Sequence, residues 1–548
     1  MSAATATATA RRWQRVLLLA ALAAAAGALS AQTPRLAPFD LEEATVADLQ
    51  QRMADGGETS RSVVEKYLTR IDEIDRRGPE LRSVLEINPD ARSIADAMDA
   101  ERRAGHLRGP LHGIPVLIKD NIATADRMMT TAGSLALAGA PAPRDAFIVE
   151  RLRAGGAVIL GKTNLSEWAN FRSTHSSSGW SGRGGQTKNP YALDRNPSGS
   201  SSGSGVAVAA NLATVAVGTE TDGSIVSPSN VNSLVGIKPT LGLVSRSGIV
   251  PIAHSQDTAG PMARTVADAA VLLGVLTGAD PRDAATADAG AKGRRDYSRS
   301  LVREGLRGAR IGVVRNRLFG YSASTDELAD QAIADLKREG AVIIDPANIP
   351  TLGKFDEDEF DVLLHEFKAD LNAYLATASP AAARSLMDII TFNKEHKSAE
   401  LPYFGQEIML LAEKKPPLTN AKYRRELASN RRLAGPQGID ATMKAHRLDA
   451  LVAPTGGPAW IIDLVNGDGG TAAAPGPSTV TSVAGYPHIT VPMGFVRGLP
   501  VGLSFFGRAW SERTLIRLAY AYEQATRHRR PPTFAPTANT NDDQRRDR

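Results

Sequence analysis

Two turns rich in serine and glycine carry the side chains best suited to chemistry in this sequence. The first is Ser198–Gly203 (SGSSSG) and the second is Thr221–Ser224 (TDGS). Between them, Val206–Val217 consists mostly of small apolar residues and holds no charged side chain. This pattern predicts a buried element that brings two hydroxyl-bearing turns together. The alternative, a flexible Ser/Gly linker, fits poorly because a linker should not run directly into a core-like segment.

A serine hydroxyl becomes an effective nucleophile only when a base removes its proton. Lysine can serve as that base if burial lowers its pKa from about 10.4 and keeps it neutral. Lys119 ends the apolar run Gly113–Ile118, which is typical of a buried strand. In such a site a second serine would relay the proton, and the tight turn Thr221–Ser224 would present backbone N–H groups as an oxyanion hole. The alternative is a lysine at a strand end that reaches water.

Other catalytic sites find weaker support. Gly199–Gly203 matches the G-x-S-x-G nucleophile motif, which would make Ser201 the nucleophile, but that motif needs a strand directly before it, whereas a polar, proline-containing loop precedes it here. The nine histidines form no i, i+4 pair. We therefore expect neither a metal nor a cofactor. The absence of cysteine excludes thiol catalysis.

The N-terminus predicts an export signal. Arg11, Arg12 and Arg15 precede the apolar run Val16–Leu29, and small residues near position 31 suit cleavage. We expect residues 1–31 to be removed and the protein to be periplasmic or secreted, without stable membrane association afterwards. A membrane anchor is the alternative, although fourteen apolar residues are few for a span. The Arg11-Arg12 pair matches twin-arginine export only loosely.

Charge gives no reason to expect a nucleic-acid partner. The formal net charge of the 548 residues is +5, and it falls to +2 without residues 1–31, which hold three arginines and no acidic residue. With 42% hydrophobic and 22% charged residues, the composition is that of a soluble globular protein.

The remaining pattern predicts one large α/β domain over residues 40–530. Residues 40–105 and 355–446 are expected to be mostly helical, the latter as a cover over the site or, alternatively, as ordinary packing. Residues 309–344 predict a strand–helix–strand unit, and residues from 531 onward a disordered tail. Further expected strands are 157–161, 448–454 and 489–492, expected helices are 265–276 and 511–527, and residues 236–240, 260–262 and 498–502 are expected as turns.

The segment from Lys162 to Pro197 is unusually long for a connection, and long loops tend to be functional. It carries Trp168, Phe171 and Trp180 in a chain with only 5% aromatic residues. These side chains are candidates for substrate binding; equally, they could fix the loop to the rest of the domain.

Six segments together resemble the amidase signature family. They are GIPVLIKDN, GKTNLSEWA, the first Ser/Gly turn, GTETDGSI, GIKPT and AGYPHITVPMG, in the order and spacing of that family over about residues 40–530. Further segments, such as GWSGRGGQTKNP and SQDTAGPMARTVADAA, resemble the peptide-amidase branch. The resemblance implies a large mixed β-sheet covered by helices on both faces.

The resemblance also implies a Ser–cis-Ser–Lys triad. It assigns the lysine to Lys119, the serine after a cis peptide to Ser200 and the nucleophile to Ser224. The oxyanion hole then falls on the backbone of Thr221, Asp222, Gly223 and Ser224. Many members of the family have glycine in place of Asp222, and a carboxylate beside a developing oxyanion is unfavourable unless it points away.

The expected function is hydrolysis of C-terminal peptide amides to a carboxylate and ammonia by a monomer, with activity falling at acid pH as Lys119 becomes protonated. The alternatives are an amidase for other acyl, fatty-acid or aryl amides and a catalytically silent binding protein. A tRNA-dependent transamidase subunit is disfavoured, because export would separate it from tRNA.

Overall fold

The computed structural model describes residues 38–139, 141–378, 383–468 and 476–539. The chain divides into two units, 1–42 and 43–548, and the description below concerns the second. The predicted export signal, residues 1–31, lies outside the described residues. In the described part of the chain, no helix combines the length and apolar character needed to cross a membrane.

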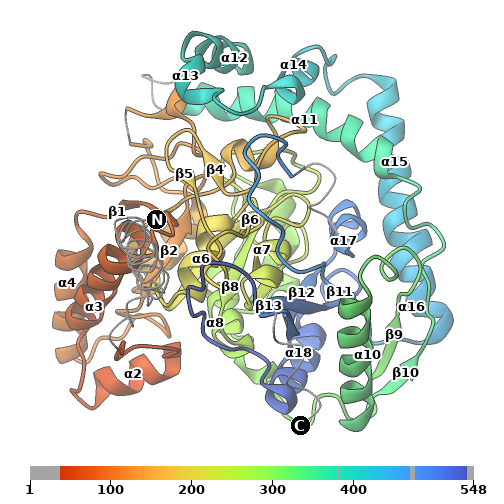
Figure 1. Cartoon of the computed structure of the whole chain (residues 1–548), viewed down its shortest axis with the longest axis horizontal. Helices are drawn as coiled ribbons and strands as arrows, with labels where there is room; N and C mark the ends of the chain where they lie inside the picture. Colours follow the sequence, from red (N-terminus) through yellow and green to blue (C-terminus); the bar gives the residue numbers. More distant parts are fainter. Residues whose placement is uncertain (1–37, 140, 379–382, 469–475, 540–548) are drawn as a thin grey trace, which may run out of the picture. The chain divides into compact units, whose positions relative to one another are not determined.

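A mixed sheet of eleven strands organises the described part of this unit (Figure 1). The strands run parallel over β3–β2–β6 and over β11–β9–β10, and the other neighbours are antiparallel. Their order across the sheet is β1 (Val84–Ile87), β3 (Val158–Thr163), β2 (Pro115–Lys119), β6 (Val215–Glu220), β8 (Thr258–Ala263), β7 (Val235–Lys238), β12 (His488–Val496), β13 (Leu499–Phe506), β11 (Ala450–Pro454), β9 (Arg310–Val313) and β10 (Val342–Ile344).

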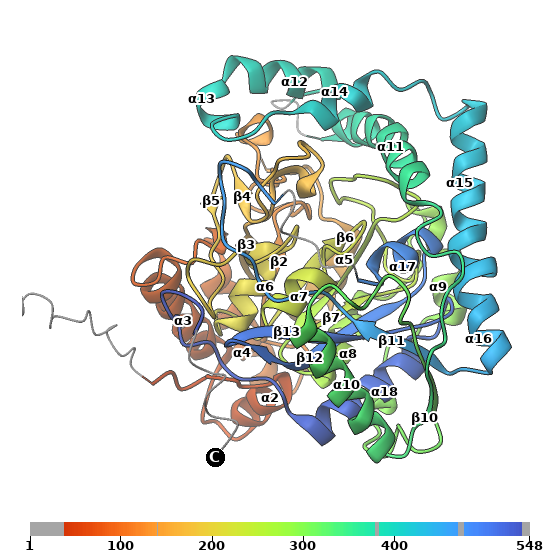
Figure 2. The ribbon, with the colours of Figure 1, turned by 45° about the vertical axis from the view of Figure 1, so that its right-hand side comes forward.

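Helices cover both faces of the central strands, which confirms the predicted fold class. Helices α6 (Ser202–Ala209) and α7 (Val226–Val231) pack on one face. Helices α8 (Val266–Leu276), α10 (Ala323–Arg338) and α18 (Glu512–Thr526) pack on the other (Figure 2). Because both faces are covered, β2 and β6 are buried along their whole length, which explains their apolar sequences.

The part predicted to be helical at the N-terminus is interrupted by a strand. Its helices are α2 (Val46–Ala54), α3 (Ser60–Arg70) with a π-helical continuation to Arg76, and α4 (Ala91–Arg103). A capping box of Thr45 and Asp48 starts α2. Strand β1 was not predicted; it has only four residues at the edge of the sheet, too few to show an alternating pattern.

Residues 355–446 form a group of helices in the described part of the chain, which we call the helical cover. Its longest member, α11 (Asp356–Thr377), is followed by α12, α13 and α14 beside the β4–β5 hairpin, and α15 leads to α16 (Figure 1). The bounds of these helices are α12 (Leu386–Glu395), α13 (Lys397–Glu400), α14 (Glu407–Glu413), α15 (Ala421–Ala434) and α16 (Asp440–His446). The predicted strand–helix–strand unit is also confirmed, as parallel β9 and β10 joined by α10.

Smaller elements complete the fold. They are α5 (Phe147–Ala154), α9 (Ala289–Lys292), α17 (Ser478–Ala484) and the hairpin of β4 (Trp180–Ser181) and β5 (Gly185–Gln186), with short 3-10 turns at Leu135–Leu137, Glu167–Asn170, Ala284–Asp288 and Ser298–Ser300 and a π turn at Gly435–Ile439.

Three segments expected as turns lie largely in strands β7, β8 and β13, although Gly498, with a φ of +79°, does lie in the turn between β12 and β13. In β7 and β8 the glycines reflect close packing rather than reversal of the chain. A Cβ atom on Gly260 would lie 2.0 Å from the Ile237 carbonyl oxygen, and one on Gly236 would lie 2.3 Å from Ser229 Oγ. Glycine inside a strand is typical of such close approaches.

The predicted disordered tail is corrected over residues 531–539. Phe534 is buried, and the Leu193 N–H donates to the Ala535 carbonyl at 2.8 Å. Thr537 Oγ1 donates to Asp194 at 2.6 Å. The tail therefore packs along the loop before Asn196, and residues 540–548 lie outside the described residues.

Candidate active site

Lys119 and Ser200 meet in the interior of the unit. Lys119 ends β2 and Ser200 lies in the loop before α6; both are fully buried. Lys119 Nζ donates to Ser200 Oγ at 2.8 Å and to Thr219 Oγ1 at 2.9 Å. The Gly199–Ser200 peptide is cis, as the family resemblance implies.

Burial lowers the pKa of Lys119 to about 7, because few groups replace the water that would solvate its charge. The carboxylates of Asp257 and Glu220 act in the opposite direction and limit the shift. In the described residues no carboxylate lies within ion-pair distance of Lys119. The lysine is thus held near the pKa at which a general base works best at neutral pH.

Glycine positions in the first turn bring Ser200 to this depth. A Cβ on Gly199 would lie 2.2 Å from Ser166 Oγ, and one on Gly203 would lie 2.3 Å from the Ser83 carbonyl oxygen. The start of α6 therefore presses against neighbouring backbone. The Ser200 carbonyl in turn accepts from the Ser166 N–H at 3.1 Å, which fixes the peptide that carries the serine.

Ser201 has a structural position. Its hydroxyl donates to the Thr219 carbonyl at 3.0 Å and accepts from the Thr219 N–H at 3.1 Å. Both bonds tie the first turn to the end of β6. The residue that a G-x-S-x-G match would select is thereby occupied by backbone contacts.

The second turn, Thr221–Ser224, offers unpaired donors. Within the described residues, the backbone N–H groups of Asp222, Gly223 and Ser224 have no hydrogen-bond acceptor. Gly223 adopts a φ of +78°, a left-handed conformation that glycine takes without strain. Just beyond the turn, the buried Glu220 carboxylate accepts from the N–H groups of Ile225 at 2.7 Å and Val226 at 3.0 Å, which anchors the start of α7.

The Asp222 carboxylate is bound away from the turn's own N–H groups. Thr479 Oγ1 of α17 donates to Asp222 Oδ2 at 2.7 Å. Burial raises the pKa of Asp222, so its negative charge is disfavoured at this position. Both features reduce the conflict expected between this carboxylate and a developing oxyanion.

Ser224 lies in the second turn, next to the turn that carries Ser200, and is buried less completely than the Lys119–Ser200 pair. It is 8% exposed, whereas Lys119 and Ser200 are fully buried. Its carbonyl accepts from the Ser201 N–H at 3.2 Å, which joins the two turns directly. Among the described residues no hydrogen bond links the hydroxyls of Ser224 and Ser200; such contacts commonly tighten only when substrate binds.

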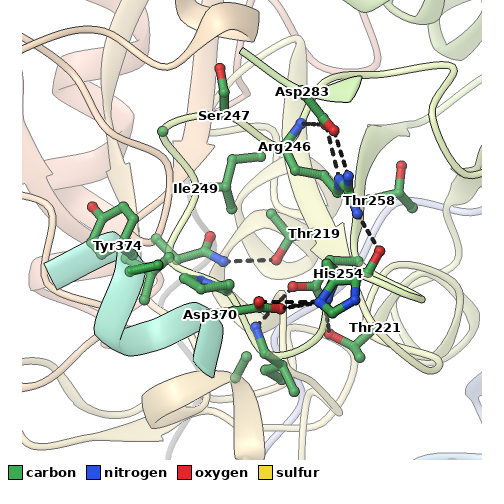
Figure 3. Close-up of a pocket in the computed structure, with 18 of the residues that line it drawn as sticks. Thr219, Thr221, Arg246, Ser247, Ile249, His254, Thr258, Asp283, Asp370 and Tyr374 are labelled. Carbon is green, nitrogen blue, oxygen red and sulfur yellow. Dashed lines mark hydrogen bonds and ion pairs between the residues drawn. The ribbon is translucent and has the colours of Figure 1, made fainter. Parts of the chain in front are cut away.

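Two cavities open on opposite ends of the second turn. Cavity 1, about 350 Å³, is lined by Thr219 and Thr221, by the loop around Ile249 and by Tyr374 of α11 (Figure 3). Cavity 2, about 370 Å³, is lined by Gly199 and Gly223, the neighbours of the two serines, and by many polar groups. Together they leave room for a substrate on either side of the turn.

The three predicted substrate-binding aromatics lie in apolar packing. Trp168 and Phe171 belong to the core cluster formed with α11, α12 and α14. Trp180 packs edge-on against Phe404 at 5.1 Å and beside the buried Arg172. None of the three lines cavity 1 or cavity 2. This placement suits the alternative that they fix the long loop to the cover; a role in substrate binding stays a prediction.

One group of described residues could offer metal ligands: His254, Glu366 and Asp370. The side chains of these residues already make hydrogen bonds or ion pairs with one another and with neighbouring residues. His254 Nδ1 lies 2.8 Å from Asp370 Oδ2, and Tyr423 donates to Glu366 at 2.7 Å. Asp370 raises the pKa of His254, so the pair acts as an ion pair between α11 and the loop that carries His254 (Figure 3).

Sequence reasoning missed several polar residues around the turns. Thr219, Glu220 and Asp257 all lie inside quoted family segments, but the sequence alone gave them no role. These residues lie at neighbouring ends of β6 and β8. Their proximity could be inferred only by knowing that the two strands pair in the sheet.

Similarity to known proteins identifies the class of protein to which this fold and site belong. A family model described as Amidase matches residues 62–516. The crystal structure of native peptide amidase from Stenotrophomonas maltophilia superposes with a TM-score of 0.86 at 54% identity, covering 91% of this chain and 100% of that one.

Two more distant relatives extend the comparison. An Arabidopsis thaliana protein described as a probable amidase is 43% identical, covering 90% of this chain and 92% of its own. The crystal structure of an amidase family protein from Bacillus anthracis superposes with a TM-score of 0.82 at 38% identity, covering 90% of this chain and 94% of that one. The chain belongs to the amidase signature family, and it is an amidase.

Lys119 gives a prediction about stability. The unfolded lysine, with a pKa of about 10.4, holds its proton up to higher pH than the folded one, whose pKa is about 7. The cost of burying the charge is present below pH 7 and is relieved as the pH rises. The free-energy advantage of Lys119→Met over the wild type should therefore shrink by about 2–3 kcal/mol between pH 6 and pH 9.

Urea unfolding at both pH values measures this difference. The matched control is Lys337→Met at an exposed position of α10, whose difference from the wild type should not change with pH. An equal stability difference at pH 6 and pH 9 for Lys119→Met would mean that the folded lysine stays charged.

Proposed function

We propose that this protein hydrolyses C-terminal peptide amides to a free carboxylate and ammonia through Ser224, Ser200 and Lys119. The observation that carries the proposal is the 2.8 Å contact between the buried Lys119 and Ser200, beside a turn with unpaired N–H donors. A buried amine of lowered pKa and a hydroxyl in contact with it form a base that can act on a neighbouring serine.

The proposed reaction begins with neutral Lys119. Ser224 Oγ attacks the amide carbonyl carbon; its proton passes to Ser200 Oγ, and the Ser200 proton passes to Lys119 Nζ. The N–H groups of the Thr221–Ser224 turn stabilise the negative charge that develops on the carbonyl oxygen. When the C–N bond breaks, Lys119 returns its proton through Ser200 to the leaving nitrogen, and ammonia departs.

The acyl-enzyme is then hydrolysed by the same groups. Water attacks the ester carbonyl while Ser200 and Lys119 accept its proton, and the proton is returned to Ser224 Oγ as the ester bond breaks. The acid product loses its own proton to solvent. Lys119 starts and ends neutral, so the cycle needs neither a cofactor nor an external base.

The peptide-amide substrate rests on similarity and on the site's polarity. At 54% identity the chain resembles a peptide amidase over nearly its whole length. Cavity 2 offers hydroxyl, amide and carboxylate groups of Ser178, Asn230 and Asp468, which suit the N–H and C=O groups of a peptide. The proposal also includes export after removal of residues 1–31 and action as a single chain without nucleic acid.

Assignment of the nucleophile predicts how serine variants label. Ser224→Ala should lose reaction with a serine-directed phosphonate and lose amide hydrolysis to the background rate. Ser201→Ala should keep labelling at position 224, because its hydroxyl bonds only to Thr219 backbone, while its stability falls by about 1–3 kcal/mol. Mass spectrometry of the labelled peptide locates the site; label on Ser201, or on Ser224→Ala, would contradict the assignment.

Substrate class is tested by ammonia release. The proposal predicts that kcat/KM for a di- or tripeptide amide exceeds that for a long-chain fatty-acid amide and for an aryl acyl amide by at least about tenfold, with Ser224→Ala as the blank. Preference for the fatty-acid or aryl substrate would assign the site to other acyl amides. A wild type that is labelled at Ser224 yet hydrolyses none of these amides would leave the nucleophile standing and refute the substrate class.

A further inference from the structure

Thr221, the first residue of the candidate oxyanion turn, is held by a loop from a neighbouring strand. Strands β6 and β8 pair in antiparallel register with Glu220 opposite Thr258, so Thr221 and Asp257 face each other one step beyond the ladder. Thr221 Oγ1 donates to Asp257 Oδ1 at 2.6 Å, and Gln256 Nε2 donates to the Thr221 carbonyl at 3.2 Å. Thr221 is thus held through both its side-chain hydroxyl and its backbone carbonyl.

Asp257 is itself fixed by the loop that carries it. Its second oxygen, Oδ2, accepts from the N–H groups of Ile252 at 2.8 Å and Ala253 at 2.9 Å. The carboxylate therefore closes the loop Ile252–Asp257 on itself while its other oxygen reaches the turn. Movement of the loop would move Thr221.

The cover helix α11 holds the same loop at three points. Glu359 accepts from Gln256 Nε2 at 2.9 Å, Glu366 accepts from the Ser255 N–H at 2.9 Å, and Asp370 accepts from the His254 N–H at 2.8 Å. These contacts lie one helical turn or two apart along α11, so a single rigid element sets the position of the loop. Figure 3 shows His254 and Asp370 facing each other beside Thr221.

The turn needs such support because its N–H groups make no bonds of their own in the described structure. The Glu220 carboxylate fixes the end of the turn, where α7 starts. The position of the beginning of the turn therefore depends on Thr221. Oxyanion donors work only when they are aimed before the charge develops, and errors of about 1 Å can cost about 100-fold in rate.

We propose that Asp257 and Gln256 are positioning residues for the oxyanion turn, which hold Thr221 so that the N–H groups of the turn converge on one point, with α11 fixing them from behind. This inference rests on the proposed role of Ser224 but not on the identity of the substrate. It gives the helical cover a part in the chemistry besides covering the site.

A double-mutant cycle of Thr221→Val and Asp257→Asn tests the inference. Thr221→Val keeps the shape of the side chain and removes the hydroxyl, and should lower kcat by about 10- to 100-fold with KM changed less than about threefold. Asp257→Asn should give a loss of similar size. Both substitutions remove the same hydrogen bond, from Thr221 Oγ1 to Asp257. The kcat of the double variant should therefore lie within about threefold of the kcat of the less active single variant.

Three choices keep the result specific. The rates are measured at pH 9, where Lys119 is neutral, because Asp257→Asn also removes a negative charge that raises the pKa of Lys119. Thr221→Ser keeps the hydroxyl and should lose far less than Thr221→Val. Ser245→Ala breaks a buried hydroxyl–carboxylate contact of 2.7 Å to Asp280 that does not touch the turn, and should leave kcat within about twofold.

The second readout is the rate of phosphonate labelling at Ser224, since a phosphoryl oxygen would occupy the same hole. It should fall in parallel with kcat, and it reports even if the amide substrate is wrongly assigned. If Asp257→Asn does not fold, Gln256→Met replaces it as a single variant: it removes the donor to the Thr221 carbonyl and should also lower kcat with KM changed less than about threefold. Losses that multiply, an effect on KM alone, or equal rates for Thr221→Val and Thr221→Ser would overturn the inference; absence of labelling in the wild type would instead refute the proposed nucleophile.

Discussion

The burial of Lys119 without a contacting carboxylate is the constraint on which the rest of the site depends. An ammonium deprived of water loses several kcal/mol of solvation, and a pKa near 7 instead of 10.4 corresponds to about 5 kcal/mol of that cost. A carboxylate in contact would remove the cost, but it would also keep the lysine protonated, so that the side chain could not accept a proton at neutral pH. Asp257 and Glu220 are close enough to moderate the shift, yet their side chains are committed elsewhere: Glu220 holds the start of α7 and Asp257 holds Thr221.

The fold meets this constraint by placing the site between strand ends and a second layer of helices. β2 delivers Lys119, β6 leads directly into the candidate oxyanion turn, and α6 and α7 start from the two serine-bearing turns. The cover helices then pack on Trp168 and Phe171 and on the loop that holds Thr221. The helical cover therefore contacts the long loop through apolar side chains and holds the loop beside Thr221 through carboxylates of α11.

Much of this was predictable from local pattern and family resemblance together. Charge-free runs predicted β2 and the α6–β6 region, and the family resemblance implied the cis peptide before Ser200. Local pattern failed where glycine served packing rather than turning, as at Gly236 and Gly260, which lie inside strands β7 and β8. Single-sequence reasoning also had no access to pairings such as Thr221 with Asp257, because they depend on which strands become neighbours.

The aromatic residues show a different limit. Trp168, Phe171 and Trp180 stand out by composition, but composition cannot tell a pocket wall from the anchor of a loop, and the structure places them in the packing beneath the cover. Residues that act on the turn from outside, such as Gln256, have no chemical signature at all until their contacts are known.

The most direct test of the central claim is the pH dependence of kcat/KM between pH 5 and pH 10. A neutral Lys119 predicts an acid limb with an apparent pKa near 7, and activity that rises with pH and then levels off. The pKa of His254 is also raised, so protonation of this histidine could produce an acid limb of its own. If Lys119 is the base, the limb should persist in His254→Asn. A profile that stays flat down to about pH 5, or a limb that disappears with His254, would contradict lysine as the base.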